Sequence, residues 1–330
     1  MMKINFNNLK NMTIGTEIEG IALVVTATKR QTKTNKDYVN VTLTDGIDQL
    51  MVNIWDWKSQ NIPQPNDVVA ITGTVSEYQG NKQINVATFK RSTEPVETFA
   101  PDGGVNVSAY KTRFRTFIDN IEDGFLKELV VRAFEDYEQL WNVVPGALSV
   151  HNDYIAGCLE HSVDVCQNAV ALYANYSSIA CLDLVIAGAL LHDFGKLQTY
   201  KLEGAVIEMT DAGQLFDHLV LGAEEIGRIG NSILKEIGDE NDRINCCRKL
   251  ELLKHIALAH HGRLEYGSPV TGKCPEAMIV TYADGMDAKM RTYSTANRKA
   301  NPGDQWTEKI YFLDNKQMLT SNYIKSIFNK

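Results

Sequence analysis

The chain has 330 residues, of which 44% are hydrophobic and 22% charged, a composition typical of a globular protein with room for two domains. The formal net charge of −8 excludes a protein that coats duplex nucleic acid by charge alone. A local basic groove or a metal site stays compatible with this charge. No apolar run reaches the roughly 18–20 residues that would span a bilayer.

Cysteine usage and the N-terminal residues point to a reducing compartment. Six cysteines occur and none forms a C-x-x-C pair, which argues against a zinc knuckle or a thioredoxin-like site. The first residues, MMKINFNNLKNMTIG, lack the apolar core of a secretion signal. We therefore expect a cytoplasmic protein with reduced cysteines and no membrane contact.

Residues 1–95 predict an all-β domain. Short runs rich in Val, Ile and Thr alternate with Asp-Gly and Gly-Asn turn signals, as in GIALVVTATKRQ, DYVNVTLTDG, LMVNIWDW and DVVAITGTVSEYQGNKQINVATF. The last run indicates a hairpin that turns near Gly80 and Asn81. About five short strands indicate an OB-fold barrel, which we interpret as a nucleic-acid-binding domain.

Basic and aromatic residues of this β domain are candidates for substrate contacts. The basic residues gather in a loop-like stretch between the first two strands, at Lys29, Arg30, Lys33 and Lys36. That loop borders the ligand face of an OB-fold, although a solvated loop explains the cluster equally well. The candidates for stacking on bases are Tyr38, Trp55, Trp57, Tyr78 and Phe89. Because strands bury every second residue, we expect two or three of these aromatics in the barrel core.

Beyond the β domain the pattern becomes helical. Residues 92–107, STEPVETFAPDGGVNV, indicate a linker, and residues 96–145 as a whole read as a linker and helical connector. From about residue 108 apolar residues recur at three- and four-residue spacing. An all-helical domain is expected over residues 146–330, with helices at 156–176, 182–195, 217–237, 248–261 and 275–290.

All seven histidines lie between residues 151 and 261. The segment LLHDFGK ends an apolar run in His192 and Asp193, two polar side chains that are costly to bury unless something satisfies them. Further metal-capable residues lie on successive apolar helices, at His161, His218, His260, His261 and Asp284. A bundle that brings them together would offer five imidazoles and two carboxylates.

Imidazoles and carboxylates together suit Mn, Fe, Co, Ni or Zn. His192 and Asp193 can both reach one ion, or the carboxylate can bridge two ions about 3.5–4 Å apart that clamp a phosphate ester. Taken singly, each histidine is explained as a hydrogen-bonded structural residue, and the His260–His261 pair as a solvated helix end. Their ordered conjunction on successive helices favours the metal centre.

These motifs resemble the HD-domain superfamily of metal-dependent phosphohydrolases. More narrowly, the chain resembles the YhaM-type 3′→5′ exoribonucleases, which join an N-terminal OB-fold to a C-terminal HD domain. The resemblance runs from about residue 15 to about residue 315. It rests on VNIWD and YQGNKQINV in the β part and on HNDYIAGCLEH, LLHDFGK, HLVLGAEE, HHGRLEYGSP and YADGMDAKM in the helical part.

The resemblance implies two divalent ions. One would be held by His161, His192, Asp193 and Asp284. Asp193 would bridge to the other, which would also be held by His218, His260 and His261. Manganese is the expected metal, with Co, Fe, Ni or Zn as alternatives.

The resemblance also implies roles around the ions. Asp193 and Lys196 would act in catalysis. Lys196 lies one helical turn beyond His192 and would face the scissile phosphate if the helix continues, with a solvated lysine as the alternative. His151 would lie near the substrate. His255 matches no functional position, so we interpret it as structural. The rim of the site would be shaped by Glu265, Gly267 and Ser268, although EYGSP also suits a plain turn.

The function we expect is removal of nucleotides from the 3′ end of single-stranded RNA by a metal-activated water, and the sequence leaves open whether single-stranded DNA is a second substrate. One alternative keeps the same chemistry on free or signalling nucleotides, with the OB-fold as a regulatory or oligomerisation module. Another is a nucleic-acid-binding protein without catalysis. Because one β domain beside one helical domain would enclose a strand poorly, we also expect a homo-oligomer.

Overall fold

A computed structural model describes the chain except for residues 56–61, 79, 149–151 and 329–330 and the side chain of Lys10. The chain divides into two compact units. The first unit comprises residues 1–103 together with 202–207, and the second comprises residues 104–201 together with 208–330. Among the described helices, none combines the length and apolar composition that crossing a bilayer requires.

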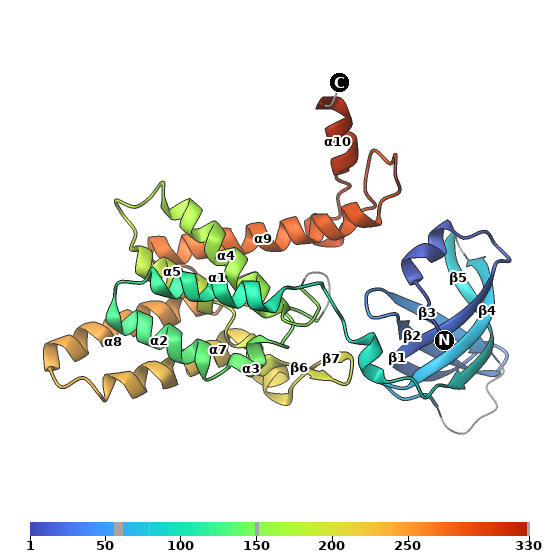
Figure 1. The fold of residues 1–330 in the computed structure, drawn as a ribbon, viewed down its shortest axis with the longest axis horizontal. Helices are drawn as coiled ribbons and strands as arrows, with labels where there is room; N and C mark the ends of the chain where they lie inside the picture. The colour runs from blue at the N-terminus through green and yellow to red at the C-terminus, as the bar shows by residue number, and fades with distance from the viewer. Residues whose placement is uncertain (56–61, 79, 149–151, 329–330) are drawn as a thin grey trace. The chain divides into compact units, whose positions relative to one another are not determined.

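The first unit is built on a five-stranded antiparallel sheet with the strand order β3-β2-β1-β4-β5 (Figure 1). Its strands are β1 (Glu17–Gln31), β2 (Asp37–Thr44), β3 (Gln49–Trp55), β4 (Val68–Tyr78) and β5 (Asn81–Arg91). The edge strands β3 and β5 approach each other, as a closing barrel requires. Two 3₁₀ helices flank the sheet, η1 (Phe6–Asn11) and η2 (Val96–Phe99). The predicted OB-like β fold is thereby confirmed.

The two faces of β2 show how the sequence positions this sheet. Val39, Val41 and Leu43 are fully buried in the barrel core. The residues that alternate with them, Tyr38, Asn40 and Thr42, are only partly buried and face outward. This alternation follows from the two-residue period of a strand.

The basic cluster lies differently from the prediction. Lys29 and Arg30 belong to the end of β1, where they pair with Val39 and Tyr38 of β2, and not to a loop. The connection is a tight turn over residues 32–36, in which the backbone N–H of Thr32 donates to the carbonyl of Lys36. The backbone pairing of β1 with β2 continues to Gln31, so β1 is longer than its polar C-terminal residues suggested.

The second unit is helical apart from one hairpin (Figure 1). Its first helices are α1 (Val107–Asp119), α2 (Gly124–Glu135), α3 (Glu138–Trp141), α4 (Gly157–Tyr173), α5 (Leu182–Leu191) and α6 (Lys196–Thr199). The hairpin strands β6 (Tyr200–Glu203) and β7 (Val206–Met209) follow, and the tip between them is assigned to the first unit. The remaining helices are α7 (Asp211–Leu234), α8 (Glu240–Ala259), η3 (Leu264–Tyr266), α9 (Pro275–Lys299), η4 (Tyr311–Leu313) and α10 (Ser321–Phe328). The predicted helical bundle is confirmed, whereas the hairpin was not predicted.

Helix α5 is the centre of this bundle. Its sequence, LDLVIAGALL, is apolar on all sides, which is typical of a helix buried all round. It packs against α4, α9, α8, α2 and α1. The predicted helix over 182–195 is too long, because α5 ends at Leu191 and a series of turns carries the chain to α6.

Gly195 and Phe194 explain why the chain turns there. A Cβ on Gly195 would lie 2.0 Å from the carbonyl oxygen of His218 and 2.5 Å from the backbone nitrogen of Gly222, so only glycine allows this approach to α7. Phe194 is buried, and its ring lies 6.0 Å from that of Trp141. Close packing on both sides therefore fixes the segment that carries His192 and Asp193.

Candidate metal centre

Seven side chains from five parts of the helical unit converge on one point. His161 comes from α4, His192 and Asp193 follow α5, and His218 lies in α7. The remaining three are His260 and His261 at the end of α8 and Asp284 in α9. Three groups of these residues each bring their nitrogen or oxygen atoms within 4.8 Å of one another: His161, His192 and Asp193; His218, His260 and His261; His192, His260 and Asp284.

The first lobe of this cluster is formed around His161 and His192. Their Nε2 atoms are 3.3 Å apart. Oδ2 of Asp193 lies 3.3 Å from each of these two nitrogens. Oδ1 of Asp284 lies 3.2 Å from Nε2 of His161 and 4.0 Å from Nε2 of His192.

The second lobe is formed around His218, His260 and His261. Nε2 of His218 lies 3.2 Å from Nε2 of His261. The other carboxylate oxygen of Asp193, Oδ1, lies 3.5 Å from Nε2 of both His218 and His260. Asp193 therefore presents one oxygen to each lobe.

The opposite nitrogen of every imidazole is engaged outside the cluster. Nδ1 of His192, His260 and His261 donates to the backbone carbonyls of Ala189, Ala257 and Tyr266, at 2.7, 2.8 and 2.9 Å. Nδ1 of the other two contacts a carboxylate: His161 contacts Asp287 at 2.7 Å, and His218 contacts Asp217 at 2.5 Å. Since these oxygens only accept, each Nδ1 carries the proton, and the Nε2 atoms are left to face one another.

A positive ion would satisfy this arrangement. In the neutral form that binds a metal, imidazoles offer only lone pairs at Nε2, and two lone pairs cannot hydrogen-bond one another. Oδ1 of Asp193 is buried and has no hydrogen-bond partner among the described residues. A buried orphan oxygen beside nitrogen lone pairs is costly unless a cation binds. Nitrogen and carboxylate donors suit Mn, Fe, Co, Ni or Zn.

The electrostatics of the two lobes differ. Burial alone would lower the pKa of His161, but hydrogen bonds to Asp193, Asp284 and Asp287 outweigh it and hold the pKa well above the usual value. Burial lowers the pKa of His218, His260 and His261, whose carboxylate contacts are fewer. The second lobe therefore keeps its imidazoles neutral, as metal binding requires.

Lys196 lies beside the shared carboxylate. Its Nζ is 2.7 Å from Oδ2 of Asp193, and the side chain is almost fully buried. The helix α5 does not continue to Lys196. A turn in which the backbone N–H of Lys196 donates to the carbonyl of Asp193 nevertheless brings the lysine side chain to the Asp193 carboxylate. Burial would raise the pKa of Asp193, but Lys196 and His192 reverse the effect and keep this carboxyl ionised.

A local distortion of α7 aims His218. Asp217 has φ 59° and ψ 164°, which breaks the helix at that residue. Its Oδ1 accepts from both the backbone N–H and the Nδ1 of His218. A non-glycine residue in this region is strained, and the two hydrogen bonds compensate for the strain. The predicted helix over 217–237 corresponds to the part of α7 after this break, whereas the part before it, from Asp211, was not predicted.

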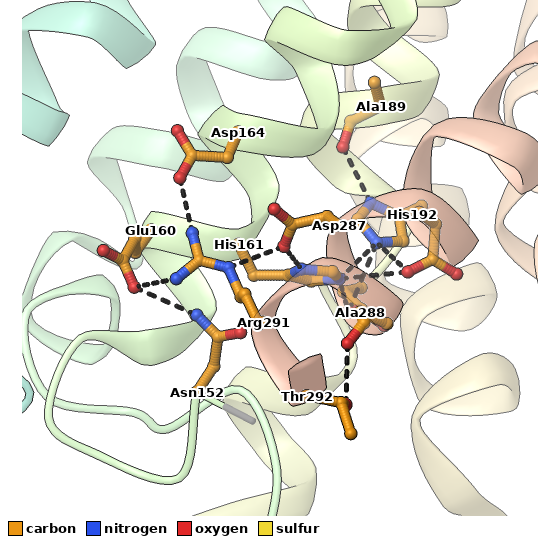
Figure 2. Close-up of polar contacts among 12 residues, drawn as sticks. Asn152, Glu160, His161, Asp164, Ala189, His192, Asp287, Ala288, Arg291 and Thr292 are labelled. Carbon is orange, nitrogen blue, oxygen red and sulfur yellow. Dashed lines mark hydrogen bonds and ion pairs between the residues drawn. The ribbon is translucent and has the colours of Figure 1, made fainter. Parts of the chain in front are cut away.

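Two residues that support the site, Asp287 and Arg291, were not predicted from the sequence. Both lie on α9, three and seven residues after Asp284, a spacing that places all three on one helical face. Asp287 orients His161, and Arg291 binds Asp287 (Figure 2). The spacing of these charged residues on an otherwise buried helical face is the feature of the sequence that could have predicted their role.

The predicted rim residues lie outside this cluster. Gly267 is exposed and adopts a left-handed conformation with φ 92°, while Ser268 is buried and its Oγ has no hydrogen-bond partner among the described residues. His151 lies outside the described residues. Nε2 of His255 accepts from the backbone N–H of Lys273, and His255 belongs to none of the three groups of converging side chains.

The first unit presents a separate row of candidate side chains. Arg30 pairs with Tyr38, and Tyr38 pairs with Trp55, so that the three residues share one sheet face. The rings of Tyr38 and Trp55 lie 4.8 Å apart, and Trp55 is 54% exposed. We call these three residues the aromatic row.

The other residues of the first unit that were predicted to contact substrate differ in how exposed they are and whether they are already paired. Lys29 is paired with Asp37 at 2.6 Å, whereas Lys33 and Lys36 are exposed in the turn. Tyr78 is 64% exposed and Phe89 is partly buried against the core. Trp57 lies outside the described residues.

Comparison with known proteins supports the two-part reading of the chain. Residues 158–289 match the family model described as HD domain, and these residues contain all seven converging side chains. The chain is 26% identical over 325 residues to the 3′-5′ exoribonuclease YhaM of Oceanobacillus iheyensis, which covers 96% of this chain and 98% of that protein. It is 27% identical over 323 residues to the 3′-5′ exoribonuclease YhaM of a Geobacillus species, which covers 96% of this chain and 94% of that protein.

These similarities confirm the resemblance that the sequence motifs indicated. The match to the HD domain and the observed donor set together indicate that the helical unit binds divalent metal. The similarity to the two YhaM proteins extends through the β unit as well, so the order of the two parts is shared.

Proposed function

We propose that this protein is a metal-dependent 3′→5′ exonuclease that hydrolyses single-stranded RNA. The observation that carries the proposal is the approach of four imidazole Nε2 atoms to the two oxygens of Asp193, with the Nε2 of His261 beside that of His218, within the segment that matches the HD domain. The similarity to YhaM exoribonucleases along nearly the whole chain supports RNA as the substrate.

The two lobes would hold two ions. His161, His192 and Asp284 would bind one, and the three histidines of the second lobe, His218, His260 and His261, would bind the other. Asp193 would bridge them, because its two oxygens face different lobes. When bound, divalent ions supply a nucleophile that is active at neutral pH and positive charge opposite the phosphate. Mn²⁺ is the ion we expect.

The chain's own residues keep this site organised. Asp193 must stay ionised to bind cations, and the Lys196 ammonium 2.7 Å away favours that state. Held there, Lys196 would also offer positive charge to a phosphate that enters the site, as expected from the sequence. The carbonyl and carboxylate partners of each Nδ1 hold the imidazole rings in place, so little reorganisation accompanies binding.

The β unit would hold the RNA strand. In the aromatic row, the exposed ring of Trp55 and the partly exposed ring of Tyr38 would offer stacking surfaces to bases, and Arg30 beside them could bind a phosphate. Such contacts accept any base, which suits an enzyme that shortens a strand step by step.

A direct test uses RNA labelled at either end. Purified protein with Mn²⁺ should convert 5′-labelled single-stranded RNA into a ladder of shorter labelled products, while 3′-labelled RNA should release labelled mononucleotide at once. Single-stranded DNA is assayed in parallel. His192→Ala should abolish both reactions. If the RNA stays intact while the protein releases phosphate from free nucleotides, the protein is a nucleotide hydrolase and the exonuclease proposal is wrong.

We also propose that the protein is a homo-oligomer. The C-terminal segment of the helical unit exposes large apolar side chains: Trp306, Tyr311, Phe312, Ile324, Ile327 and Phe328. The same unit has an apolar groove of about 740 Å³ between α4 and α9, lined by residues such as Tyr176, Ile179, Met278, Tyr282 and Met286. Exposed aromatic clusters of this kind mark protein interfaces.

A second copy would fill the groove, because the chain's own α10 is too short to reach it. Ser321, which begins α10, is hydrogen-bonded to Asn297 near the end of α9. Tyr282 lies fifteen residues earlier on α9, or about 22 Å away, whereas the eight residues of α10 span about 12 Å. Light scattering should show that Ile324→Asp with Ile327→Asp lowers the molecular mass, while Ser326→Asp leaves it unchanged. An unchanged mass in the double variant would contradict this interface.

A further inference from the structure

Arg291 lies in the network of polar contacts behind His161 (Figure 2). Its three guanidinium nitrogens reach three different carboxylates. Nε donates to Asp287 at 2.8 Å, Nη1 donates to Glu160 at 2.7 Å, and Nη2 donates to Asp164 at 2.5 Å. Only 21% of the arginine side chain is exposed. One cation thus balances three largely buried acids from α4 and α9.

The contact with Asp287 connects Arg291 to the candidate metal centre. A single oxygen of Asp287, Oδ2, accepts from both Nε of Arg291 and Nδ1 of His161. The opposite nitrogen of that imidazole, Nε2, lies in the first lobe. A continuous chain of hydrogen bonds therefore runs from Arg291 through Asp287 to a predicted metal-binding atom.

The contact with Glu160 connects Arg291 to the segment that precedes α4. Glu160 also accepts from the amide of Asn152 at 3.1 Å and from the hydroxyl of Tyr154. Nη1 of Arg291 lies 3.1 Å from the same hydroxyl. Residues 152–154 and the ring of His161 are therefore held by one guanidinium.

We propose that Arg291 is a positioning residue that sets the affinity of the first lobe for its metal ion. It does so by fixing the Asp287 carboxylate, and through it the direction in which Nε2 of His161 points. The inference rests on the proposed function in one respect, namely that the seven converging residues bind divalent metal. Beyond the proposed function, it makes Arg291 a residue that sets the affinity for metal without contacting the metal or the substrate.

Lysine cannot replace arginine in this role. A guanidinium is planar and its N–H groups point in fixed, divergent directions, which match three acids placed around it. An ammonium is a single point of charge and can approach one or two of these acids closely. Arg291→Lys should therefore preserve the charge but release Asp287 or Glu160.

The test measures metal binding without RNA. Co²⁺ is titrated into metal-free wild type, Arg291→Lys and Arg291→Met, and the visible absorption of bound Co²⁺ reports each lobe. We expect one of two binding steps to weaken by about 10- to 100-fold in both variants, the usual effect of losing a residue that orients a ligand. The other step should stay within about twofold of wild type, which a general loss of structure would not allow.

Arg113 provides a matched control. Its guanidinium binds the other oxygen of Asp164 at 2.8 Å, so it belongs to the same cluster of charges at its outer edge. Arg113→Met should bind Co²⁺ as wild type does. Equal weakening in Arg113→Met would mean that the charge of the cluster matters and not the orientation of Asp287, and would overturn the proposal.

Further outcomes separate this inference from the proposed function. If wild type binds Co²⁺ and both Arg291 variants bind it equally well, the positioning role is wrong while the metal centre stands. If wild type binds no Co²⁺, both fail. Should Arg291→Met not fold, Asp287→Asn decides, because it keeps the side-chain shape and must weaken the same single step.

Discussion

The two candidate sites of this protein are built in opposite ways. In the helical unit, donor atoms from five parts of the chain meet at depth, and every imidazole is held from behind by an oxygen atom. In the β unit, the aromatic row is a simple consequence of strand pairing and lies open at the surface. One site is rigid and enclosed, and the other is shallow and accessible.

The difference corresponds to what each site has to do. Hydrolysis of a phosphodiester needs groups held in fixed positions, since small displacements reduce the rate strongly. Binding a flexible strand of any sequence needs flat rings and positive charge that tolerate many arrangements. The comparison predicts that substitutions in the helical unit act on the rate of hydrolysis, whereas those in the β unit act on RNA binding.

The largest effect is expected for Asp193→Asn. The amide loses the negative charge that both lobes share, so the rate of RNA cleavage should fall by roughly 10³-fold or more, as when one member of a catalytic unit is removed. Single-turnover cleavage of labelled RNA in Mn²⁺ measures the change. Asp211→Asn, at an exposed position in the first turn of α7, is the control. A rate above one tenth of wild type in Asp193→Asn would contradict the role of the shared carboxylate.

Removal of metal should affect the two units unequally. Ions present at about 100 times their dissociation constant stabilise the folded state by about 2.7 kcal/mol, which corresponds to roughly 100-fold slower hydrogen exchange through opening. Chelation should therefore accelerate exchange in α4, α5 and α7 and leave β1 to β5 within about twofold. Hydrogen exchange measured by mass spectrometry resolves these segments. Equal acceleration in both units would show that the metal is not confined to the helical unit.

Substitution of Trp55 tests the aromatic row. Trp55→Ala should weaken binding of single-stranded RNA by roughly tenfold, because a stacked base contributes about 1–3 kcal/mol. The rate of cleavage at saturating RNA should not change. Met51→Ala is the matched control, since Met51 is exposed on the same face of β3. Fluorescence anisotropy measures the affinity, and a loss of rate without a loss of affinity would refute the division of labour.

The smallest effect on RNA binding is expected for Arg30, and none is expected for its neighbour Lys29. Arg30 shares a face with Tyr38, whereas Lys29 pairs with Val39 on the opposite face and binds Asp37. Arg30→Gln should lower RNA affinity a few-fold and reduce its dependence on salt by about one phosphate contact. Lys29→Gln should change neither by more than the error of the measurement. A greater loss in Lys29→Gln would reverse the assignment of the binding face.

Much of the architecture could be predicted from local patterns. The alternation of β2 and the uniformly apolar α5 indicated a β domain followed by a helical one, because burial imposes a period on any segment that lies against a core. The identities of the seven converging residues were also evident, since metal-capable side chains on apolar helices need a partner. What a residue type can do chemically is a local property.

The tertiary structure alone decided how these residues meet. The end of α5 at Leu191 depends on the approach of Gly195 to α7, and the aim of His218 depends on a strained Asp217. Asp287 and Arg291 lie more than 120 residues from His161 in the chain, yet they orient its ring. Such contacts arise from packing between distant segments, and no local pattern of residues encodes a distance or a direction between them.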